Sequence, residues 1–212
     1  MKYLQANEVA YTYRNKYQTV HALRGVSADF MPGKMYAIIG SSGSGKTTFL
    51  SLLAACLVFG MGEALDRDAY RLEHVSVIYQ NFNLFSHLTA LENAAYPLYV
   101  RKTARKEADM LAQEKLLAVG LEEEQLGRFP NMLSGGEQQR VAIARALAAG
   151  SEIILADEPT GNLDSENSRN IVEILQKLAY EENRCVIIVT HDPAVAEAAD
   201  TVLHMQDGKL AM

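Results

Sequence analysis

The chain has 212 residues, of which 49% are hydrophobic and 22% charged, a composition that is ordinary for a globular protein with a buried core. Its formal net charge of −6 disfavours a nucleic-acid-binding protein, because such proteins usually present a basic face. Cys56 and Cys185 lie in apolar runs without a partner at metal-ligand spacing, so both are predicted to be buried free thiols.

Targeting and membrane-spanning segments are not recognisable. The opening residues MKYLQANEVAYTYR lack the apolar core of a signal peptide. The most apolar stretch, residues 49–61, is shorter than the roughly 20 residues that span a bilayer. We therefore expect a soluble protein whose link to a membrane comes through a partner.

Strand-like and helical patterns alternate along the chain. The strand-like runs are residues 35–39, 74–79, 152–156, 185–190 and 201–206. Several are continuously apolar, as in a sheet that is covered on both faces. The helical patterns are residues 47–58, 89–100, 103–119, 136–148, 165–183 and 193–199. This alternation predicts an α/β fold with a mainly parallel sheet.

One mostly helical stretch, residues 81–131, interrupts the alternation. We expect it to form a helical subdomain that is inserted into an α/β core made of residues 1–80 and 132–212. No repeat, low-complexity tract or linker separates these parts, so residues 1–212 are predicted to form one domain.

Residues 40–47, GSSGSGKT, match the phosphate-binding loop G-x-x-x-x-G-K-[ST] between a predicted strand and a predicted helix. In such a loop the glycines let backbone N–H groups surround phosphates, the lysine reaches the β and γ oxygens, and the Ser or Thr hydroxyl binds Mg²⁺. The nucleotide contacts predicted here are Gly40, Ser41, Ser42, Gly43, Ser44, Gly45, Lys46, Thr47 and Thr48.

A second phosphate-binding surface is predicted at residues 133–140, LSGGEQQR. Ser134 stands three residues before Glu137 and just ahead of an apolar-periodic stretch, the arrangement of a capping box that opens a helix. Thr89 and Glu92 form the same pattern. Gly135 and Gly136 leave backbone N–H groups uncovered at the positive end of the helix, where anions are favoured. The presence of both surfaces predicts an ATP held from two sides by two copies of the protein.

Acidic residues end one of the buried strands. Asp157 follows the apolar run IILA, and Glu158 comes next. At this position Asp157 can hold Mg²⁺ beside the phosphate loop, and Glu158 can orient or deprotonate the attacking water. Without the phosphate loop upstream, the same pair would be interpreted as an acidic turn before Pro159.

Two further polar residues end predicted strands. His191 follows CVIIVT, and Gln80 follows HVSVIY; strand ends of this kind are where ligands of α/β folds bind. His191 can donate a hydrogen bond to a γ-phosphate, although a lone histidine is more often structural. Gln80 can contact Mg²⁺ or the attacking water.

In chain order these motifs resemble those of the ATP-binding-cassette (ABC) ATPases, over nearly the whole chain. GSSGSGKT is similar to their Walker A motif, LSGGEQQR to the signature motif and ILADEP to Walker B. Gln80 resembles the Q-loop glutamine, Asp164 in GNLD the D-loop aspartate and His191 the switch histidine. The resemblance implies that Tyr13 stacks on adenine, with Tyr11 as the alternative.

A narrower resemblance points to one branch of these ATPases. QNFNLFSHLTALENAAYPL and EPTGNLDS are similar to the branch that contains lipoprotein-release, macrolide-efflux and antimicrobial-peptide transport ATPases. In that branch the region after Gln80 receives a coupling helix from the membrane subunit. Phe82, Leu84, Phe85 and Leu88 would then be the apolar anchors, unless they fill the core of the helical subdomain instead.

One part of the chain departs from the family. The interval between Lys46 and Gln80 is short, and its sequence shows no recognisable Gly-rich antiparallel hairpin. Either the antiparallel β-subdomain is shortened, or a loop is missing from this chain.

The resemblance implies an ATP-hydrolysing subunit of an ABC transporter, cytoplasmic and held at the inner face of the membrane by a permease that docks on residues 82–91. It would pair as a homodimer, or with a related ATPase subunit, and power export or extraction of a peptide, lipoprotein or drug. Lys46, Glu158 and His191 would be catalytic, and Thr47, Gln80 and Asp157 would hold Mg²⁺. Ser134, Gly135, Gly136 and Asp164 would act across the dimer.

Other functions of the same family stay open. A cell-division ATPase of the same branch transmits force to a membrane partner without moving a substrate, and the ATPase core does not separate it from a transporter. DNA-repair or chromosome clamps carry a long coiled coil, and ribosome-acting factors carry tandem cassettes. Neither feature is present, and the acidic composition argues against a nucleic-acid partner.

Overall fold

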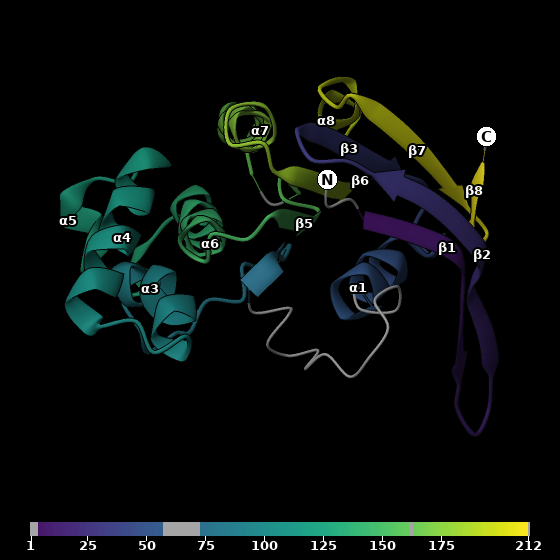
Figure 1. Ribbon diagram of the computed structural model, residues 1–212, viewed down its shortest axis with the longest axis horizontal. Helices are drawn as coiled ribbons and strands as arrows, with labels where there is room; N and C mark the ends of the chain where they lie inside the picture. Colours follow the sequence, from purple (N-terminus) through teal and green to yellow (C-terminus); the bar gives the residue numbers. More distant parts are fainter. Residues whose placement is uncertain (1–3, 57–72, 162, 212) are drawn as a thin grey trace.

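A sheet with the strand order β4-β5-β6-β3-β7-β8 lies at the centre of the computed structural model, which describes residues 4–56, 73–161 and 163–211 (Figure 1). Neighbouring strands run parallel, except that β8 pairs antiparallel with β7. The strands are β3 (Lys34–Ile39), β4 (Val75–Ile78), β5 (Ile153–Asp157), β6 (Cys185–Thr190), β7 (Thr201–Gln206) and β8 (Lys209–Ala211). The prediction of an α/β fold with a mainly parallel sheet is confirmed.

The central strands are continuously apolar because both of their faces are covered. On β6, Val186 and Ile188 join one hydrophobic cluster, while Ile187 and Val189 join another on the opposite face. β5 divides in the same way, with Ile154 on the first side. Alternate side chains of a strand point to opposite faces, so each face needs its own layer of cover.

Helices supply that cover. α7 (Ser165–Tyr180) and α8 (Pro193–Glu197) lie along one face, and α1 (Lys46–Cys56) lies on the other (Figure 1). Phe49 and Leu50 of α1 pack into the same cluster as Ile187 of the sheet. α1 begins directly after the phosphate loop, so this packing fixes the position of the loop against the sheet.

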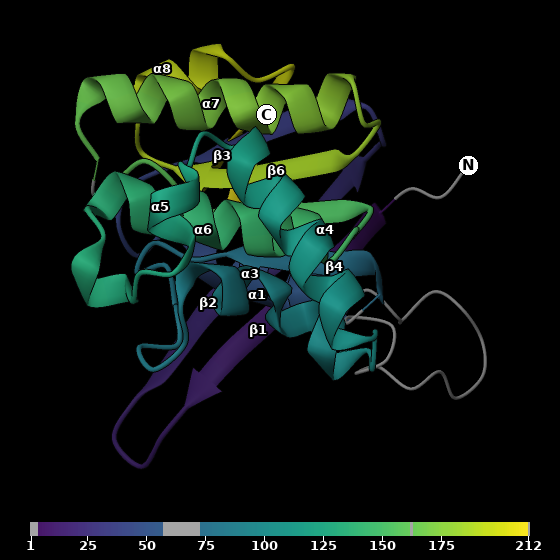
Figure 2. The ribbon, with the colours of Figure 1, turned by 90° about the vertical axis from the view of Figure 1, so that its left-hand side faces the viewer.

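A group of helices extends from one edge of the sheet in Figure 1 and faces the viewer in Figure 2. It contains α3 (Ala90–Val100), α4 (Arg105–Ala118), α5 (Glu123–Leu126), the 3₁₀ turn η1 (Pro130–Met132) and α6 (Gly135–Ala148). Fully buried alanines, among them Ala94, Ala108 and Ala144, let these helices approach closely. Buried residues of α6, among them Val141 and Ile143, belong to the same cluster as Ile78 of β4, so α6 connects the group to the sheet.

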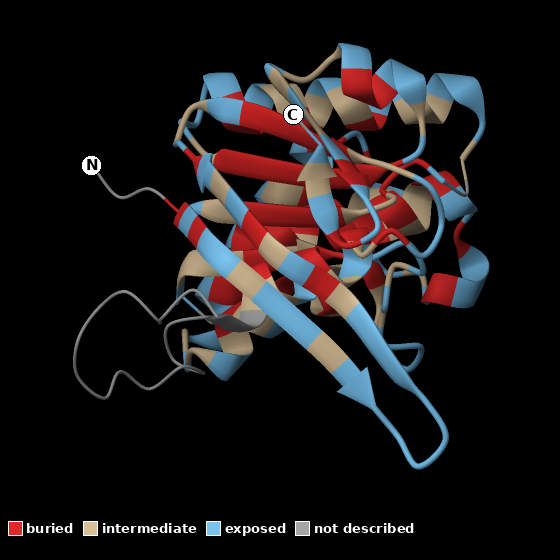
Figure 3. Ribbon diagram, turned by 90° about the vertical axis from the view of Figure 1, so that its right-hand side faces the viewer, coloured by how far each residue is buried: buried red, intermediate tan, exposed pale blue. Residues whose placement is uncertain are grey.

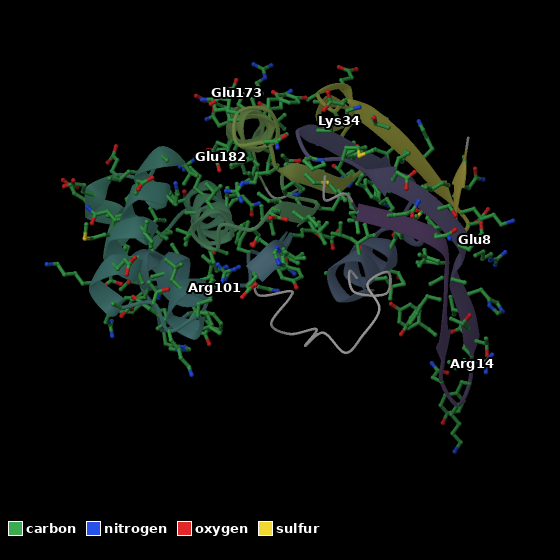
Figure 4. The ribbon with its side chains drawn as sticks, viewed as in Figure 1. Glu8, Arg14, Lys34, Arg101, Glu173 and Glu182 are labelled. Atoms are coloured by element: carbon green, nitrogen blue, oxygen red, sulfur yellow. The ribbon has the colours of Figure 1, made fainter. Side chains whose placement is uncertain are left out.

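An antiparallel hairpin, β1 (Leu4–Arg14) and β2 (Thr19–Phe30), forms a separate two-stranded sheet. The sequence analysis did not predict these strands. The tip of the hairpin extends away from the domain and is mostly exposed (Figure 3), and Arg14 near the tip carries its side chain clear of the core (Figure 4). Towards the domain, β2 buries Leu23, Val26 and Phe30, which are spaced three and four residues apart, and register shifts interrupt the pairing of the two strands. No regular apolar alternation therefore marks these strands in the sequence.

Several predicted boundaries are shifted by local backbone geometry. The helix expected over residues 165–183 ends at Tyr180, because Asn183 has the left-handed φ of +53°. The short elements β8, α5 and η1 were also not predicted. Both predicted capping boxes, Thr89 with Glu92 and Ser134 with Glu137, are confirmed.

Some predictions lie outside the described residues. The shortened interval before Gln80 falls mainly on residues 57–72, and nothing is described of the Cys56 side chain. Cys185 is a buried free thiol, as predicted, and burial raises its pKa to about 12. Within the described ranges, no helix combines the length and apolarity needed to cross a membrane.

Candidate functional site

A cleft of about 850 Å³ opens where the carboxyl-terminal ends of β4, β5, β6 and β3 meet. The residues that follow or end these neighbouring strands lie side by side because the strands are parallel, so motifs far apart in sequence share one edge. The predicted residues that line the cleft are Tyr13, Gly40, Ser42, Gly43, Gly45, Lys46, Thr47, Thr48, Gln80, Asp157, Glu158 and His191.

The phosphate loop leaves no room for side chains at two of its glycines. A Cβ at Gly40 would lie 2.1 Å from the carbonyl oxygen of Met205. Gly45 has a φ of +104°, and a Cβ there would lie 2.5 Å from the carbonyl oxygen of Ala22. The loop backbone is therefore seated directly against β2 and β7.

The Lys46 side chain binds back to the backbone of the phosphate loop. Its Nζ donates hydrogen bonds to the carbonyl oxygens of Gly40, at 2.8 Å, and Ser41, at 3.0 Å, and the residue is only 8% exposed. Beside it, the buried Ser44 hydroxyl has no hydrogen-bond partner among the described residues. A buried cation and an unsatisfied hydroxyl on a glycine-rich loop fit an anionic ligand such as a nucleotide phosphate.

Two oxygen-bearing side chains that suit a divalent cation, those of Thr47 and Asp157, lie beside the phosphate loop in the cleft. The Thr47 hydroxyl donates to Asp157 Oδ1 at 3.3 Å. Burial raises the pKa of Asp157, and the neighbouring Glu158 carboxylate raises it further, while the Thr47 hydrogen bond and Lys46 lower it; the net shift is upward. A partly desolvated carboxylate beside a hydroxyl suits Mg²⁺, which prefers oxygen ligands and retains phosphate oxygens and water in its shell.

Glu158 and His191 meet at the mouth of the cleft. His191 Nδ1 lies 2.8 Å from Glu158 Oε1, and the His191 backbone N–H donates to Oε2 at 3.3 Å. Glu158 has a left-handed φ of +48°, and its own N–H donates to the Val189 carbonyl at 2.8 Å. The glutamate side chain is 13% exposed and that of His191 is 70% exposed, so the histidine can also reach a ligand in the cleft.

The opposite end of the cleft is aromatic. The Tyr13 hydroxyl lies 3.3 Å from the Thr48 hydroxyl, and the Tyr11 ring packs edge-on against Tyr13 with centroids 4.9 Å apart. Of these tyrosines, only Tyr13 is among the described residues that line the cleft. Its half-exposed ring is therefore the better placed of the alternatives for stacking on a base.

The sequence analysis missed the wall formed by β2 and the turn between β7 and β8. The lining residues involved are Val20, His21, Ala22, Arg24, Asp207 and Gly208. The Gly208 N–H donates to the Ser44 carbonyl at 3.0 Å, and the Arg24 N–H donates to the Gly208 carbonyl at 2.8 Å. This turn thus supports the phosphate loop from behind, and its DG dipeptide was the one local signal that could have indicated it.

The signature residues stand apart from this cleft. Ser134 caps α6, accepting from the Glu137 N–H at 3.3 Å while its own N–H donates to Glu137 Oε2 at 2.6 Å. Burial raises the pKa of Glu137, but hydrogen bonding of its carboxylate to the backbone and side chain of Ser134, together with the nearby Arg128 and Arg140, lowers it, and the net shift is downward. Among the described lining residues, Ser134, Gly135, Gly136 and Asp164 do not occur.

Asp164 caps α7 next to the signature helix. It accepts hydrogen bonds from the backbone N–H groups of Glu166 and Asn167, and the hydrogen bonds from Asn167 hold its pKa below the usual value. The Asn167 amide oxygen also accepts from Arg140 at 3.0 Å, and a Cβ at Gly136 would lie 2.9 Å from this oxygen. The two motifs expected to act on a partner are therefore adjacent to each other.

Residues 23–161 match the family model described as ABC transporter. The ATP-binding protein YclH of Bacillus subtilis, named as an uncharacterized ABC transporter protein, is 37% identical over 100% of this chain and 97% of its own length. The macrolide export protein MacB of Escherichia coli K12 is 42% identical over 98% of this chain, which spans 34% of MacB.

Solved structures agree with these relatives. The dimeric structure of the bacterial ABC transporter cassette MJ0796 matches with a TM-score of 0.89 and 35% identity, over 100% of this chain and 97% of MJ0796. A post-hydrolysis state of MJ0796 bound to ADP and Pi matches over the same shares with a TM-score of 0.88. The chain belongs to the ABC transporter family as one of its ATP-binding cassettes.

Proposed function

We propose that this cassette hydrolyses ATP to ADP and phosphate in the described cleft and uses the reaction to drive a membrane partner. The observation that carries the proposal is the meeting of Lys46, Thr47, Asp157, Glu158 and His191 at one edge of the sheet. A phosphate-binding loop, cation ligands and a water-activating carboxylate are the components that phosphoryl transfer to water requires.

Each residue has a defined task in this proposal. The N–H groups of the phosphate loop and the Lys46 ammonium bind the β and γ phosphate oxygens, which replace the carbonyl partners of Lys46. Glu158 accepts the proton of the attacking water. In the nucleotide-free cleft the His191 ring holds the Glu158 carboxylate through the 2.8 Å contact. With ATP bound, the ring N–H would donate to the γ-phosphate instead, while the His191 backbone N–H keeps its hydrogen bond to the carboxylate.

Thr47, Gln80 and Asp157 would hold Mg²⁺. They fit this role because the Thr47 hydroxyl and the Asp157 carboxylate already lie within hydrogen-bond distance beside the phosphate loop. When bound, the ion would neutralise charge on the phosphate oxygens.

The complete site would contain residues from a second cassette. The α6 N-terminus, with Ser134, Gly135 and Gly136, lies outside the lining of its own cleft, yet it has the positive end of a helix dipole that suits an anion. In a head-to-tail dimer it would cover the ATP of the partner, and Asp164 would face that partner. The partner would be a second copy or a related ATPase subunit, and MJ0796, a relative of known structure, is dimeric.

The membrane partner would dock on residues 82–91. Phe85 is exposed and packs against the exposed Tyr96 with ring centroids 4.5 Å apart, which provides an aromatic surface for a helix of a permease. By analogy with the macrolide export protein MacB, the transported substrate would be a drug. The resemblance of the sequence motifs to the wider branch extends this proposal to a lipoprotein or peptide, with the cassette at the cytoplasmic face of the membrane. The alternative is a cell-division ATPase that transmits force to its partner.

Hydrolysis by the purified chain tests the ATPase activity. We expect Mg²⁺-dependent release of phosphate that Lys46→Ala abolishes, because the loop loses its cation. Lys177→Ala, at an exposed position on α7, is the matched control and should be fully active. Equal activity of both variants would refute the site.

Co-purification tests the partner. After expression in the source cell and mild detergent extraction, the cassette should retain an integral membrane protein, and Phe85→Glu should release it. Tyr17→Glu, on the hairpin tip where Tyr17 is 90% exposed, is the control for added charge. Retention by the Phe85 variant would place docking elsewhere, and the identity of the captured protein would distinguish a transporter from a cell-division complex.

A further inference from the structure

The backbone directly after Gln80 is held in an unfavourable conformation. Phe82 and Asn83 have φ values of +59° and +47°, in the left-handed region that a bulky side chain such as that of Phe82 rarely adopts. Successive left-handed residues are unusual, and persist only where the surrounding structure imposes them. The turn that sets the direction of the chain leaving Gln80 therefore depends on outside support.

Arg145 of α6 provides that support. Its Nη1 donates to the Asn83 carbonyl and its Nη2 to the Phe82 carbonyl, both at 2.7 Å. The planar guanidinium thus binds both carbonyls of the turn at once, as its rigid fork allows. The guanidinium is largely desolvated, and burial lowers its pKa. A desolvated cation bound to two carbonyls resists displacement, because moving either partner would leave a buried charge incompletely paired.

The far end of the same segment has a separate anchor. Asn93 of α3 is fully buried; its amide oxygen accepts from the Phe85 N–H, and its amide nitrogen donates to the Phe85 and Leu88 carbonyls. Asn93 therefore fixes the part of the segment that contains the aromatic docking surface. The part next to Gln80 is fixed from α6, the helix whose first turn is capped by Ser134.

We propose that Arg145 is a positioning residue for the active site: by holding the turn at Phe82 and Asn83, it keeps Gln80 directed at the metal end of the cleft. Arg145 does not occur among the described residues that line the cleft, so it acts through the backbone and not by contact with the nucleotide. The same bonds connect the signature helix mechanically to Gln80. The inference rests on the proposed function, in which Gln80 is a ligand of Mg²⁺.

The chain contains a matched control for this interaction. Arg184 Nη1 donates to the carbonyls of Gly150 and Ser151 at 2.7 and 2.6 Å, just before β5 and so at the opposite edge of the sheet from the cleft. Arg145 binds its two carbonyls with both of its Nη atoms, whereas Arg184 uses Nη1 alone. Arg145→Lys and Arg184→Lys each keep the positive charge but lose the planar guanidinium. Both substitutions therefore alter an arginine that binds two successive backbone carbonyls, and only one of them lies next to Gln80.

The experiment compares these variants in Mg²⁺-dependent ATP hydrolysis and in hydrogen exchange of the backbone. For Arg145→Lys we expect the half-saturating Mg²⁺ concentration to rise about tenfold, as for other residues that orient a metal ligand, with ATP affinity measured without Mg²⁺ unchanged. Amides of residues 80–83 should exchange faster, whereas the Phe85 amide, which Asn93 holds separately, should not. Arg184→Lys should lower Tm without either effect.

A double variant shows whether Arg145 acts through Gln80. Adding Arg145→Lys to Gln80→Ala should cause no further rise in the Mg²⁺ requirement, because the two changes remove one function. The proposal would be overturned if the two substitutions raised the half-saturating Mg²⁺ concentration independently, so that their effects multiplied in the double variant. It would also be overturned if Arg145→Lys and Arg184→Lys required the same Mg²⁺ concentration. Neither outcome would contradict the ATPase activity. An unmodified chain without Mg²⁺-dependent hydrolysis would instead refute the proposed function, and the role of Arg145 with it.

Discussion

Glu158 and His191, 33 residues apart in the sequence, contact each other at the mouth of the cleft with 2.8 Å between Oε1 and Nδ1. The His191 backbone N–H also donates to the other carboxylate oxygen, so the carboxylate is held by two groups of one residue. The left-handed backbone of Glu158 and its N–H bond to Val189 hold the glutamate from its own side. The proposed base is therefore positioned before any ligand binds, which avoids a cost of ordering it during the reaction.

Replacing Glu158 tests its assignment as the base. Glu158→Gln keeps the size of the side chain and a hydrogen-bonding oxygen but cannot accept a proton. We expect kcat to fall by about 10²–10⁴-fold with ATP affinity retained, so that an ATP-bound dimer accumulates and is seen by size-exclusion chromatography. Glu173→Gln, on the exposed side of α7 (Figure 4), is the control and should behave like the unmodified chain.

The same variant serves to test whether His191 acts through Glu158. His191→Ala alone should also slow hydrolysis, and combining it with Glu158→Gln should add little, because residues that act as a unit are non-additive. Undiminished turnover in Glu158→Gln would show that another group activates the water.

The signature motif can be tested by complementation between two inactive chains. Ser134→Arg should leave ATP binding to one chain nearly intact but prevent dimer closure and hydrolysis, because a bulky cation occupies the α6 N-terminus. Lys46→Ala should be inactive for the opposite reason, through its own phosphate loop. A mixture should recover part of the activity, since one of the two sites in a mixed dimer combines an intact loop with an intact signature motif.

Ala118→Arg is the control for Ser134→Arg, because it also adds an arginine to the surface. Ala118 is exposed at the end of α4, where a cation is favourable, and full activity is expected. Absence of recovery in the mixture, with both proteins folded, would contradict a site shared between subunits.

Asp157→Asn should separate stability from activity. Burial raises the pKa of Asp157 in the folded chain, so the contribution of this group to stability is complete below its unfolded pKa and is lost as the pH rises through the folded pKa. At pH 7 the ionised carboxylate thus destabilises the nucleotide-free protein. The amide variant should have a higher Tm, by a few degrees at most, and no Mg²⁺-dependent hydrolysis.

The pH dependence is the specific signature of this effect. The Tm difference between Asp157→Asn and the unmodified chain should shrink as the pH is lowered toward about 4, where the free carboxyl titrates. Asp29→Asn, at an exposed position of β2, should leave Tm unchanged at both pH values. A lower Tm for Asp157→Asn at pH 7 would mean that the Thr47 hydrogen bond outweighs the desolvation.

Alanine at two glycines of the phosphate loop distinguishes steric contact from backbone strain. Gly40→Ala places a Cβ 2.1 Å from a backbone carbonyl, so the loop must move, and we expect loss of ATP binding with a large fall in Tm. Gly43 has a φ of +79° but open space around it, so Gly43→Ala should cost only about 1–2 kcal/mol. Thermal unfolding and nucleotide titration of both variants test this difference. Equal falls in Tm would mean that the close approach of the Met205 carbonyl to Gly40 does not decide the cost of the substitution.

Local features of the site could be predicted from the sequence because they depend on neighbouring residues. The capping box of Ser134 and Glu137 closes within one helical turn. The strand Cys185–Thr190 matches its expected bounds, since a buried parallel strand needs an uninterrupted apolar run. The phosphate loop is likewise a short segment whose glycines, lysine and threonine act within one turn.

Tertiary structure alone decided what these segments contact. The sequence could place Glu158 and His191 at strand ends, but their 2.8 Å contact exists because β5 and β6 are neighbours in the sheet. No local pattern connects Arg145 to the turn at Phe82 and Asn83, more than 60 residues earlier, or seats the hairpin of β1 and β2 beside the phosphate loop. Side-chain type and spacing therefore determined the chemistry that this chain carries, whereas the order of the strands and the packing of α6 determined which groups act together.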